Sequence, residues 1–462
     1  MPKKYSIEVI PAASRAAPIG KYRIDRGAED CISCGRCVKT CVYGVHTRRE
    51  DDPRRLAEPL DQHCKGCFRC IQECPRNALT IQYSDKYLRL GDSYWTPEII
   101  STTWYQAETG KVPISGAGYG GPFSGRGFDA MWTDMSEIVR PTRDGIHGRE
   151  YISTAVDIGR TPSTLTFDAR GSVTSTIPTT ITIPLPIILN TLPFGRSERV
   201  HDALARAASR LDTLMLVDLG EWLRRAPDAH LVPFIGQEEQ QRLPHDLLQG
   251  CPMIELEYHS AVPEIVKAVK SGSPETIISV RLPCGERVRE RVDALVSAGA
   301  EVIHLHADLP GQEASSASGD PYYLKDVIRE VHGQLVDLKV RDEMTLVVSG
   351  GIALPEHVAK AILCGADITA IDLPLLIALE CHDCKDYLNG HSCPSRPEEL
   401  DVQWGAQRII NLLAAWRNQL LEVLGAMGLR EVRRLRGEVG RAIFAEDLQR
   451  EVFDPLFAQG VT

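Results

Sequence analysis

Eight cysteines near the start of the chain occur in two runs with the same spacing. The first run reads C-x2-C-x2-C-x3-C from Cys31 to Cys41, and the second repeats it from Cys64 to Cys74. Three thiolates on one tight loop can bind three irons of an iron–sulfur cube, and the fourth thiolate reaches the other cube. The spacing therefore predicts two [4Fe–4S] clusters that carry electrons.

This spacing resembles that of bacterial two-cluster ferredoxins, and the resemblance assigns a ligand set to each cluster. The first cluster would be held by Cys31, Cys34, Cys37 and Cys74. The second would be held by Cys64, Cys67, Cys70 and Cys41. One departure is Val42, which follows Cys41 where the second run has Pro75 after its last cysteine. A pair of zinc knuckles is the alternative, but zinc needs four ligands and has no use for the duplicated pattern.

Length, charge and hydropathy narrow the class of protein. The 462 residues are enough for two or three domains, and the first twenty contain no apolar core long enough for a secretory signal. The net charge of −10 argues against a nucleic-acid partner. The longest uncharged stretch, residues 171–195, holds four prolines, which argue against a membrane-spanning helix. We expect a cytoplasmic protein without a membrane span.

Short apolar runs alternate with helical patterns in eight units between residues 181 and 380. This rhythm predicts a (β/α)8 TIM barrel, with a doubly wound open sheet as the alternative. The expected fold is thus α/β, a TIM barrel with an N-terminal two-cluster ferredoxin domain and a C-terminal helical segment. The expected parts are the ferredoxin domain at 1–90, an irregular Gly/Pro-rich lead-in at 91–180, the barrel at 181–380, and a Cys-rich loop with helices at 381–462.

Polar residues gather at the carboxyl ends of three predicted strands, where barrel enzymes perform their chemistry. Because side chains alternate along a strand, the inward sets are Glu255, Glu257 and His259, then Ser279 and Arg281, then His304, His306 and Asp308. So many polar groups would be costly in a dry core, which favours a solvated pocket for a polar ligand. The candidate catalytic residues are Glu255, Glu257, His304 and His306. A metal site at the two histidines, or polar residues without a function, are the alternatives.

The seventh predicted strand ends in Ser349-Gly350-Gly351, and a helix follows after Pro355. Glycines before a helix start let backbone N–H groups close around a phosphate, and barrels often build that site after strands seven and eight. Beside two iron–sulfur clusters, the phosphate compound we expect is FMN, because flavin converts single electrons into pairs. Arg281 would suit the pyrimidine edge of the flavin.

The later part of the chain resembles the FMN-binding synthase domain of glutamate synthase, in the short archaeal form preceded by a ferredoxin module. The similar stretches are the loop from Phe194 through Gly195 to Ser197, "VSGGIALPEHVAKAILCGAD", and "LLIALEC". The cofactor-binding residues that we predict are Phe194, Gly195, Ser279, Arg281, Ser349, Gly350, Gly351 and Gly365.

The resemblance also implies a third iron–sulfur cluster, [3Fe–4S] or [4Fe–4S], after the eighth strand. Cys381 and Cys393 match the first and last of three family cysteines, and Cys384 replaces the middle one, which would fall near Leu388. Zinc bound by these cysteines with His382 or His391, or free thiols, are the alternatives.

Several substrate motifs of that family are rewritten. The 2-oxoglutarate stretch after strand four is here His259–Val262, and the Gly-Thr after strand eight is Asp372-Leu373. We therefore expect an FMN-dependent oxidoreductase that acts as an electron-transfer subunit beside other redox subunits, of a flavin reductase, hydrogenase or dehydrogenase type. Genuine glutamate synthesis from 2-oxoglutarate and ammonia is the alternative, and a structural subunit with an inactive flavin site is a third possibility.

Overall fold

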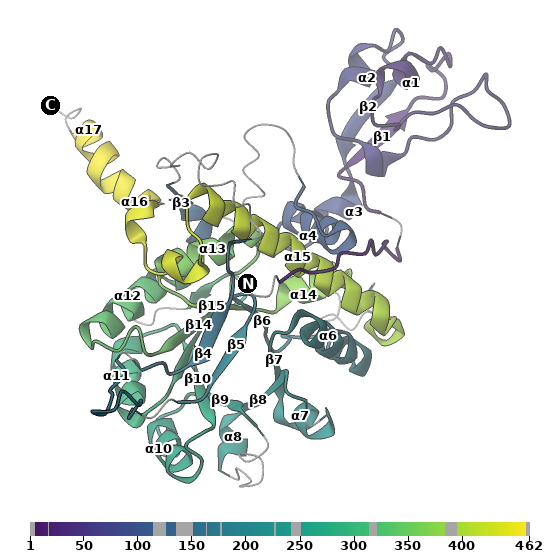
Figure 1. Ribbon diagram of the computed structural model, residues 1–462. Coiled ribbons are helices and arrows are strands. Elements are labelled where there is room, and N and C mark those ends of the chain that lie inside the picture. The colour runs from purple at the N-terminus through teal and green to yellow at the C-terminus, as the bar shows by residue number, and fades with distance from the viewer. Residues whose placement is uncertain are drawn as a thin grey trace.

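The computed structural model describes residues 5–16, 18–113, 126–134, 151–162, 164–175, 178–225, 228–241, 251–313, 321–383 and 395–458. A small N-terminal module and a larger barrel lie at opposite ends of the molecule, joined by short helices (Figure 1). In the part of the chain that is described, no helix is long and apolar enough to cross a membrane.

The N-terminal module is built on a two-stranded antiparallel sheet. Strand β1 (Tyr22–Arg26) pairs with β2 (Leu79–Tyr83), so the two ends of the cysteine-containing segment are held side by side. Between them lie α1 (Arg36–Thr40), η1 (Asp61–His63) and α2 (Arg69–Gln72). The apolar core is small and includes several cysteines, which is typical of a module that depends on bound metal for stability.

The segment between module and barrel is more regular than the sequence indicated, because it contains a 13-residue helix. Helix α4 (Pro97–Thr109) begins at Thr96, whose side chain accepts the Ile99 N–H, and ends at Gly110 with φ 67°. The remaining elements of this segment are α3 (Asp85–Leu88), η2 (Gly127–Ala130), β3 (Met131–Thr133) and β4 (Val156–Gly159). Strand β4 pairs with β5 (Thr180–Ile183) in an antiparallel hairpin.

Eight parallel strands close into a barrel, which confirms the predicted fold and excludes the open sheet. In chain order they are β6 (Ile187–Leu189), β7 (Met215–Asp218), β8 (Leu231–Ile235), β9 (Met253–Glu257), β10 (Ile277–Pro283), β11 (Val302–His306), β14 (Thr345–Ser349) and β15 (Ile368–Ile371). They are almost wholly buried, as apolar runs between a barrel core and a helical layer must be.

The helices around the barrel are α6 (Glu198–Leu211), α7 (Leu219–Arg225), α8 (Gln237–Gln240), α10 (Val262–Gly272), α11 (Val288–Ala298), α12 (Leu324–Asp337), α13 (Pro355–Cys364) and α14 (Leu373–Ala378). A short pair, β12 (Gln312–Glu313) and β13 (Tyr322–Tyr323), extends the loop after β11. Helix α6 begins where Ser197 accepts the Val200 N–H, so Ser197 serves as a helix cap.

The predicted C-terminal helical segment is confirmed. The 25-residue helix α15 (Val402–Ala426) packs on α6, α4 and α13 (Figure 1). Its fully buried Arg408 donates to the carbonyls of Ala378 and Ala12 at 2.6 and 2.8 Å, so α15 fastens the N-terminal segment to the barrel. The last elements are η6 (Pro397–Glu399), η7 (Val432–Leu435), η8 (Val439–Arg441), β16 (Ala442–Phe444), α16 (Ala445–Leu448), η9 (Gln449–Phe453) and α17 (Asp454–Ala458).

Candidate functional site

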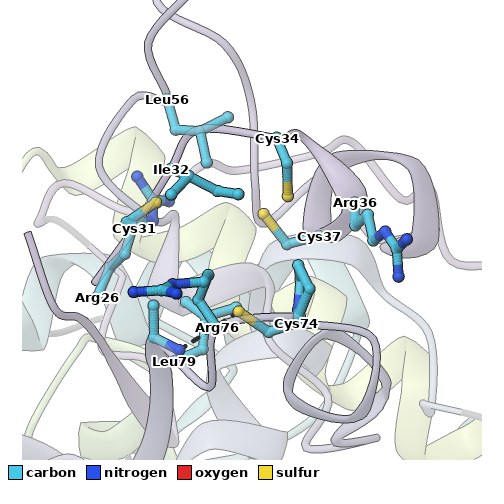
Figure 2. A pocket seen from close by; sticks show the side chains of 12 residues that line it. Arg26, Cys31, Ile32, Cys34, Arg36, Cys37, Leu56, Cys74, Arg76 and Leu79 are labelled. Carbon is cyan, nitrogen blue, oxygen red and sulfur yellow. Dashed lines mark hydrogen bonds between the residues drawn. The ribbon is translucent and has the colours of Figure 1, made fainter.

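The N-terminal module gathers its eight cysteines into two sets of four. The first seat is lined by Cys31, Cys34, Cys37 and Cys74, the set that the sequence assigned to the first cluster. Their sulfur atoms face one common space (Figure 2). The second seat is lined by Cys41, Cys64, Cys67 and Cys70. Each seat thus takes three cysteines from one run and one from the other.

The shape of these seats favours clusters over zinc. Among the described residues, no three Cys, His, Asp or Glu side chains converge closely enough to hold a single metal ion. A four-iron cube holds its ligands farther apart than one zinc ion does. Burial raises the pKa of Cys70 to about 11, helped by the neighbouring thiolates, so its thiolate form depends on bound metal.

Each seat also contains buried side-chain nitrogen atoms that have no hydrogen-bond partner among the described residues. In the first seat these are Nε and Nη2 of Arg26, and in the second both ring nitrogens of His46. A buried donor without an acceptor costs roughly 1–3 kcal/mol. The sulfur atoms of a bound cluster would supply the missing acceptors, so the residues present fit an iron–sulfur cluster in both seats.

At the barrel mouth, Glu255 on β9 is the centre of a buried polar network. Its carboxylate accepts from Arg281 Nε at 2.7 Å and from Ser279 Oγ at 2.9 Å, and His304 Nδ1 lies 2.8 Å away. Burial alone would raise the pKa of Glu255, but the charge of the Arg281 guanidinium and the hydrogen bonds from His304 and Ser279 outweigh it and lower the pKa to about 2. Glu255 is therefore an ionised carboxylate.

The network continues through Ser349 to the surface of the mouth. Ser349 Oγ lies 2.8 Å from His304 Nε2 and 2.8 Å from His306 Nδ1. Burial lowers the pKa of both histidines, that of His306 to about 3, so both rings are neutral at pH 7. This row of hydrogen bonds can pass a proton between the half-buried His306 and the fully buried Glu255.

Arg281 extends the network across the barrel to the end of β6. Its Nη1 donates to Thr191 Oγ1 at 3.0 Å and its Nη2 to Asn190 Oδ1 at 2.8 Å. The guanidinium carbon lies 4.1 Å from the ring centre of Phe234 on β8. Sequence reasoning missed Asn190, Thr191 and Phe234. Their position at strand ends was the one signal available.

The structure corrects two expectations about this mouth. The inward polar groups do not form a solvated pocket: Glu255 and His304 are 1% and 0% exposed, and they satisfy one another. Glu257, a candidate catalytic residue, is exposed and accepts the Gln237 N–H at 3.0 Å, outside the network. His259 pairs with Gln240 and the exposed Asp308 accepts the Gln312 N–H. Glu257 is the last residue of its strand and the other two lie at loop starts, where strand alternation no longer fixes the direction of a side chain.

The predicted phosphate loop after β14 has the expected backbone. Gly350 and Gly351 have φ 96° and 64°, a region that favours glycine, and α13 begins four residues later. The Gly351 N–H, however, donates to the Leu309 carbonyl at 3.2 Å, and Tyr94 Oη donates to the Gly351 carbonyl at 2.6 Å. At the start of α13, Pro355 has no N–H and the His357 N–H donates to the Leu354 carbonyl at 3.0 Å, which leaves the Glu356 N–H for a phosphate on this side.

The loop after β15 differs more from a phosphate site. The buried Asp372 carboxylate accepts the Leu373 N–H at 2.6 Å and lies 3.5 Å from Asn190 Nδ2. Burial raises the pKa of Asp372. A carboxylate here would repel a phosphate, and it already accepts the Leu373 N–H that a phosphate would need. The residues present therefore fit FMN at the α13 side and at Arg281, but not at the strand-eight side.

Gly365 is not a cofactor residue. It ends α13 with φ 124°, and a Cβ on it would lie 2.5 Å from His332 Cβ. Because α13 runs away from the carboxyl ends of the strands, its last residue lies at the opposite end of the barrel from the mouth. The glycine is needed for the helix end.

Cys381 lies beside the other part of the predicted flavin site. It lines a small cavity of about 30 Å³ with Phe194 and Gly195. Its sulfur accepts the Asp383 N–H at 3.4 Å, as Cys64 accepts the Gly66 N–H at 3.4 Å in the second seat. Asp383 and Gly66 also share a positive φ, 47° and 65°. Cys384 and Cys393 lie outside the described residues.

Comparisons with known proteins agree with this architecture. Residues 30–79 match the 4Fe-4S dicluster domain, and residues 245–430 match the conserved region in glutamate synthase. Residues 245–430 are therefore similar to the glutamate synthase family. The archaeal-type glutamate synthase [NADPH] of Dehalococcoides mccartyi is 25% identical, covering 93% of this chain and 97% of the relative. The archaeal glutamate synthase [NADPH] of Archaeoglobus fulgidus is 26% identical and covers 94% of this chain and 96% of the relative. The archaeal-type enzyme of Thermotoga maritima is 27% identical and covers 92% of this chain and 94% of the relative.

The two matches together indicate the class of chemistry. The chain is an iron–sulfur oxidoreductase of the glutamate synthase type, and FMN is the flavin that the family implies. The family match begins before β9 and ends after α15. It therefore includes the Glu255 network, the glycine loop and Asp372.

Proposed function

We propose that this chain is an electron-transfer subunit of a larger redox complex, with two [4Fe–4S] clusters, FMN at the barrel mouth and a third cluster at Cys381. The observation that carries the proposal is the contrast between two complete four-cysteine seats and a barrel mouth whose polar groups are bound to one another. Binding of a polar substrate there would first have to break these buried contacts.

The arrangement of module and barrel supports electron exchange between them. A groove of about 630 Å³ is lined by Cys64 of the second seat on one side and by Trp104 and Arg408 on the other. The Trp104 ring lies 5.3 Å from the ring of His382, which adjoins Cys381. The second seat is therefore the one beside the barrel.

The first seat offers a contact surface for a partner subunit. Cys34 and Ile32 are exposed there, and Ile32 is 61% exposed. The charged residues that line this seat are Arg26, Arg36 and Arg76, without a carboxylate. We infer that the partner presents an acidic surface to this end of the module, since opposite charges speed the encounter of electron-transfer proteins.

Cys384 and Cys393 complete the proposed third site by sequence. The turn after Cys381, with a positive φ at Asp383 and an N–H bond to sulfur, has the geometry of the turn after Cys64 in the second seat. That likeness favours an iron–sulfur cluster over free thiols. Purified protein should then contain about eleven to twelve irons per chain.

A second function, glutamate synthesis, is supported by the similarity to archaeal-type glutamate synthases, which covers more than nine-tenths of this chain and of each relative. An assay of 2-oxoglutarate-dependent reoxidation of the reduced protein, with ammonia present, separates the two. We expect no reoxidation above the rate without 2-oxoglutarate. Sustained turnover to glutamate would contradict the electron-transfer proposal, and iron without flavin after reconstitution would contradict its FMN.

Replacing Asp372 tests how FMN is held. Asp372→Gly removes a buried carboxylate and leaves a backbone that can turn its N–H toward a phosphate. We expect FMN to bind at least tenfold more tightly, about 1.4 kcal/mol, when titrated into flavin-free protein and followed by fluorescence quenching. Riboflavin, which lacks the phosphate, serves as the control and should gain nothing. An equal gain for both flavins would show that Asp372 does not act on the phosphate.

A further inference from the structure

The buried, unpartnered donors of the two cluster seats differ in charge. Arg26 on β1 uses Nη1 to donate to the Ala57 carbonyl at 2.9 Å, while its Nε and Nη2 are buried without a partner. His46 is 2% exposed, and neither of its ring nitrogens has a partner. One of these residues lines each seat. Protein interiors rarely keep such groups unless a ligand completes them.

The asymmetry matters because a cluster becomes more negative when it is reduced. Hydrogen bonds to its sulfur atoms and nearby positive charge both stabilise the reduced form and raise its reduction potential. Arg26 provides both effects, since a guanidinium keeps its charge at all relevant pH values. His46 provides a hydrogen bond with little charge, because an imidazole is mostly neutral at pH 7 and above, whereas a guanidinium is always charged.

We propose that Arg26 and His46 are the positioning residues that set the reduction potentials of the two clusters, and that Arg26 raises the potential of the first cluster above that of the second. The two clusters would then be reduced in order, first the cluster beside Arg26 and then the cluster beside the barrel groove. This inference depends on the two clusters of the proposed function. Iron analysis reports on that premise separately, since protein lacking eight irons in its N-terminal module would contradict the function rather than the roles of these residues.

The test is a redox titration of the full-length protein followed by EPR, with iron content measured on the same samples. Arg26→Gln should lower the upper potential and narrow the gap between the two. At a fixed potential the ratio of reduced to oxidised first cluster should fall at least tenfold, about 59 mV for one electron. The control is Arg23→Gln, which removes an exposed arginine from the same strand and should leave both potentials in place.

His46→Phe should lower the reduction potential of the second cluster and so widen the difference between the two potentials. His46→Gln, which keeps an N–H donor, should restore most of the lost potential. If Arg26→Gln does not retain iron, Arg26→Lys replaces it and should narrow the gap by a smaller amount. Unchanged potentials at full iron content, or equal shifts in the Arg26 and Arg23 variants, would overturn the proposal.

Discussion

Chains carrying Cys74→Ala are expected to lose the first cluster and keep the second, although Cys74 belongs to the second cysteine run. The reason is that Cys74 lines the first seat with Cys31, Cys34 and Cys37, and its sulfur accepts the Ala78 N–H at 3.3 Å there. Iron should fall by about four per chain. Electron exchange between an external donor that docks at the first seat and the barrel should fall to background, because the second seat is the one beside the barrel groove.

Double variants show which cysteines share a cluster. Adding Cys31→Ala to Cys74→Ala should remove no further iron, whereas adding Cys64→Ala should remove about four more. Cys284→Ala is the matched control, because Cys284 is buried in the barrel away from both seats. If Cys31→Ala and Cys74→Ala together removed the iron of both clusters, each run would hold its own cluster and the crossed assignment would be wrong.

Glu255→Gln is expected to destabilise the barrel by about 3–5 kcal/mol, because it leaves the buried Arg281 guanidinium without its counter-ion. Glu255 is 1% exposed and bonded to three side chains, so its replacement cannot be compensated by water. Glu257→Gln, two residues along the same strand, is exposed and should change stability by no more than about 0.5 kcal/mol. The measurement is the urea midpoint of the barrel followed by tryptophan fluorescence.

A double variant separates the ion pair from simple packing. Glu255→Met with Arg281→Met removes both charges, and it should recover a large part of the stability that Glu255→Gln loses. If the loss of unfolding free energy in the double variant equalled the sum of the losses in Glu255→Met and Arg281→Met, the two residues would not be coupled. The destabilisation would then come from packing alone.

The same network predicts loss of stability in acid. The folded-state pKa of Glu255, about 2, lies below its ordinary value of 4.5, so its contribution is complete above pH 4.5 and is lost as pH falls toward 2. The pKa of His306 is about 3 against an ordinary 6.5. Unfolding lets this ring take up a proton, so stability also falls as pH drops below 6.5. The urea midpoint should therefore decrease as pH falls from 6.5 toward 3, and Glu255→Gln should flatten the part of that decrease below pH 4.5.

The cysteine spacing and the strand rhythm determined most of the fold. The two runs assigned each sulfur to its seat, because the ligands of a small cluster must come from short loops of fixed length. The eight apolar runs gave the eight barrel strands, because a strand buried on both sides has to be continuously apolar. Strand alternation also predicted that Glu255, Arg281 and His304 point inward, and the strand register places Glu255 beside Ser279 and Arg281 beside His304.

Contacts between distant segments were decided by the tertiary structure alone. The sequence predicted a solvated pocket at Glu255 and His304, whereas these buried side chains hydrogen-bond to each other. It also predicted that Gly365 binds the flavin, whereas Gly365 ends helix α13 at the far end of the barrel. Arg26 and His46 carried no motif, because their role comes from being buried beside a seat rather than from spacing. Local patterns record which elements form, whereas partners hundreds of residues apart are set only when the barrel closes and brings strand ends together.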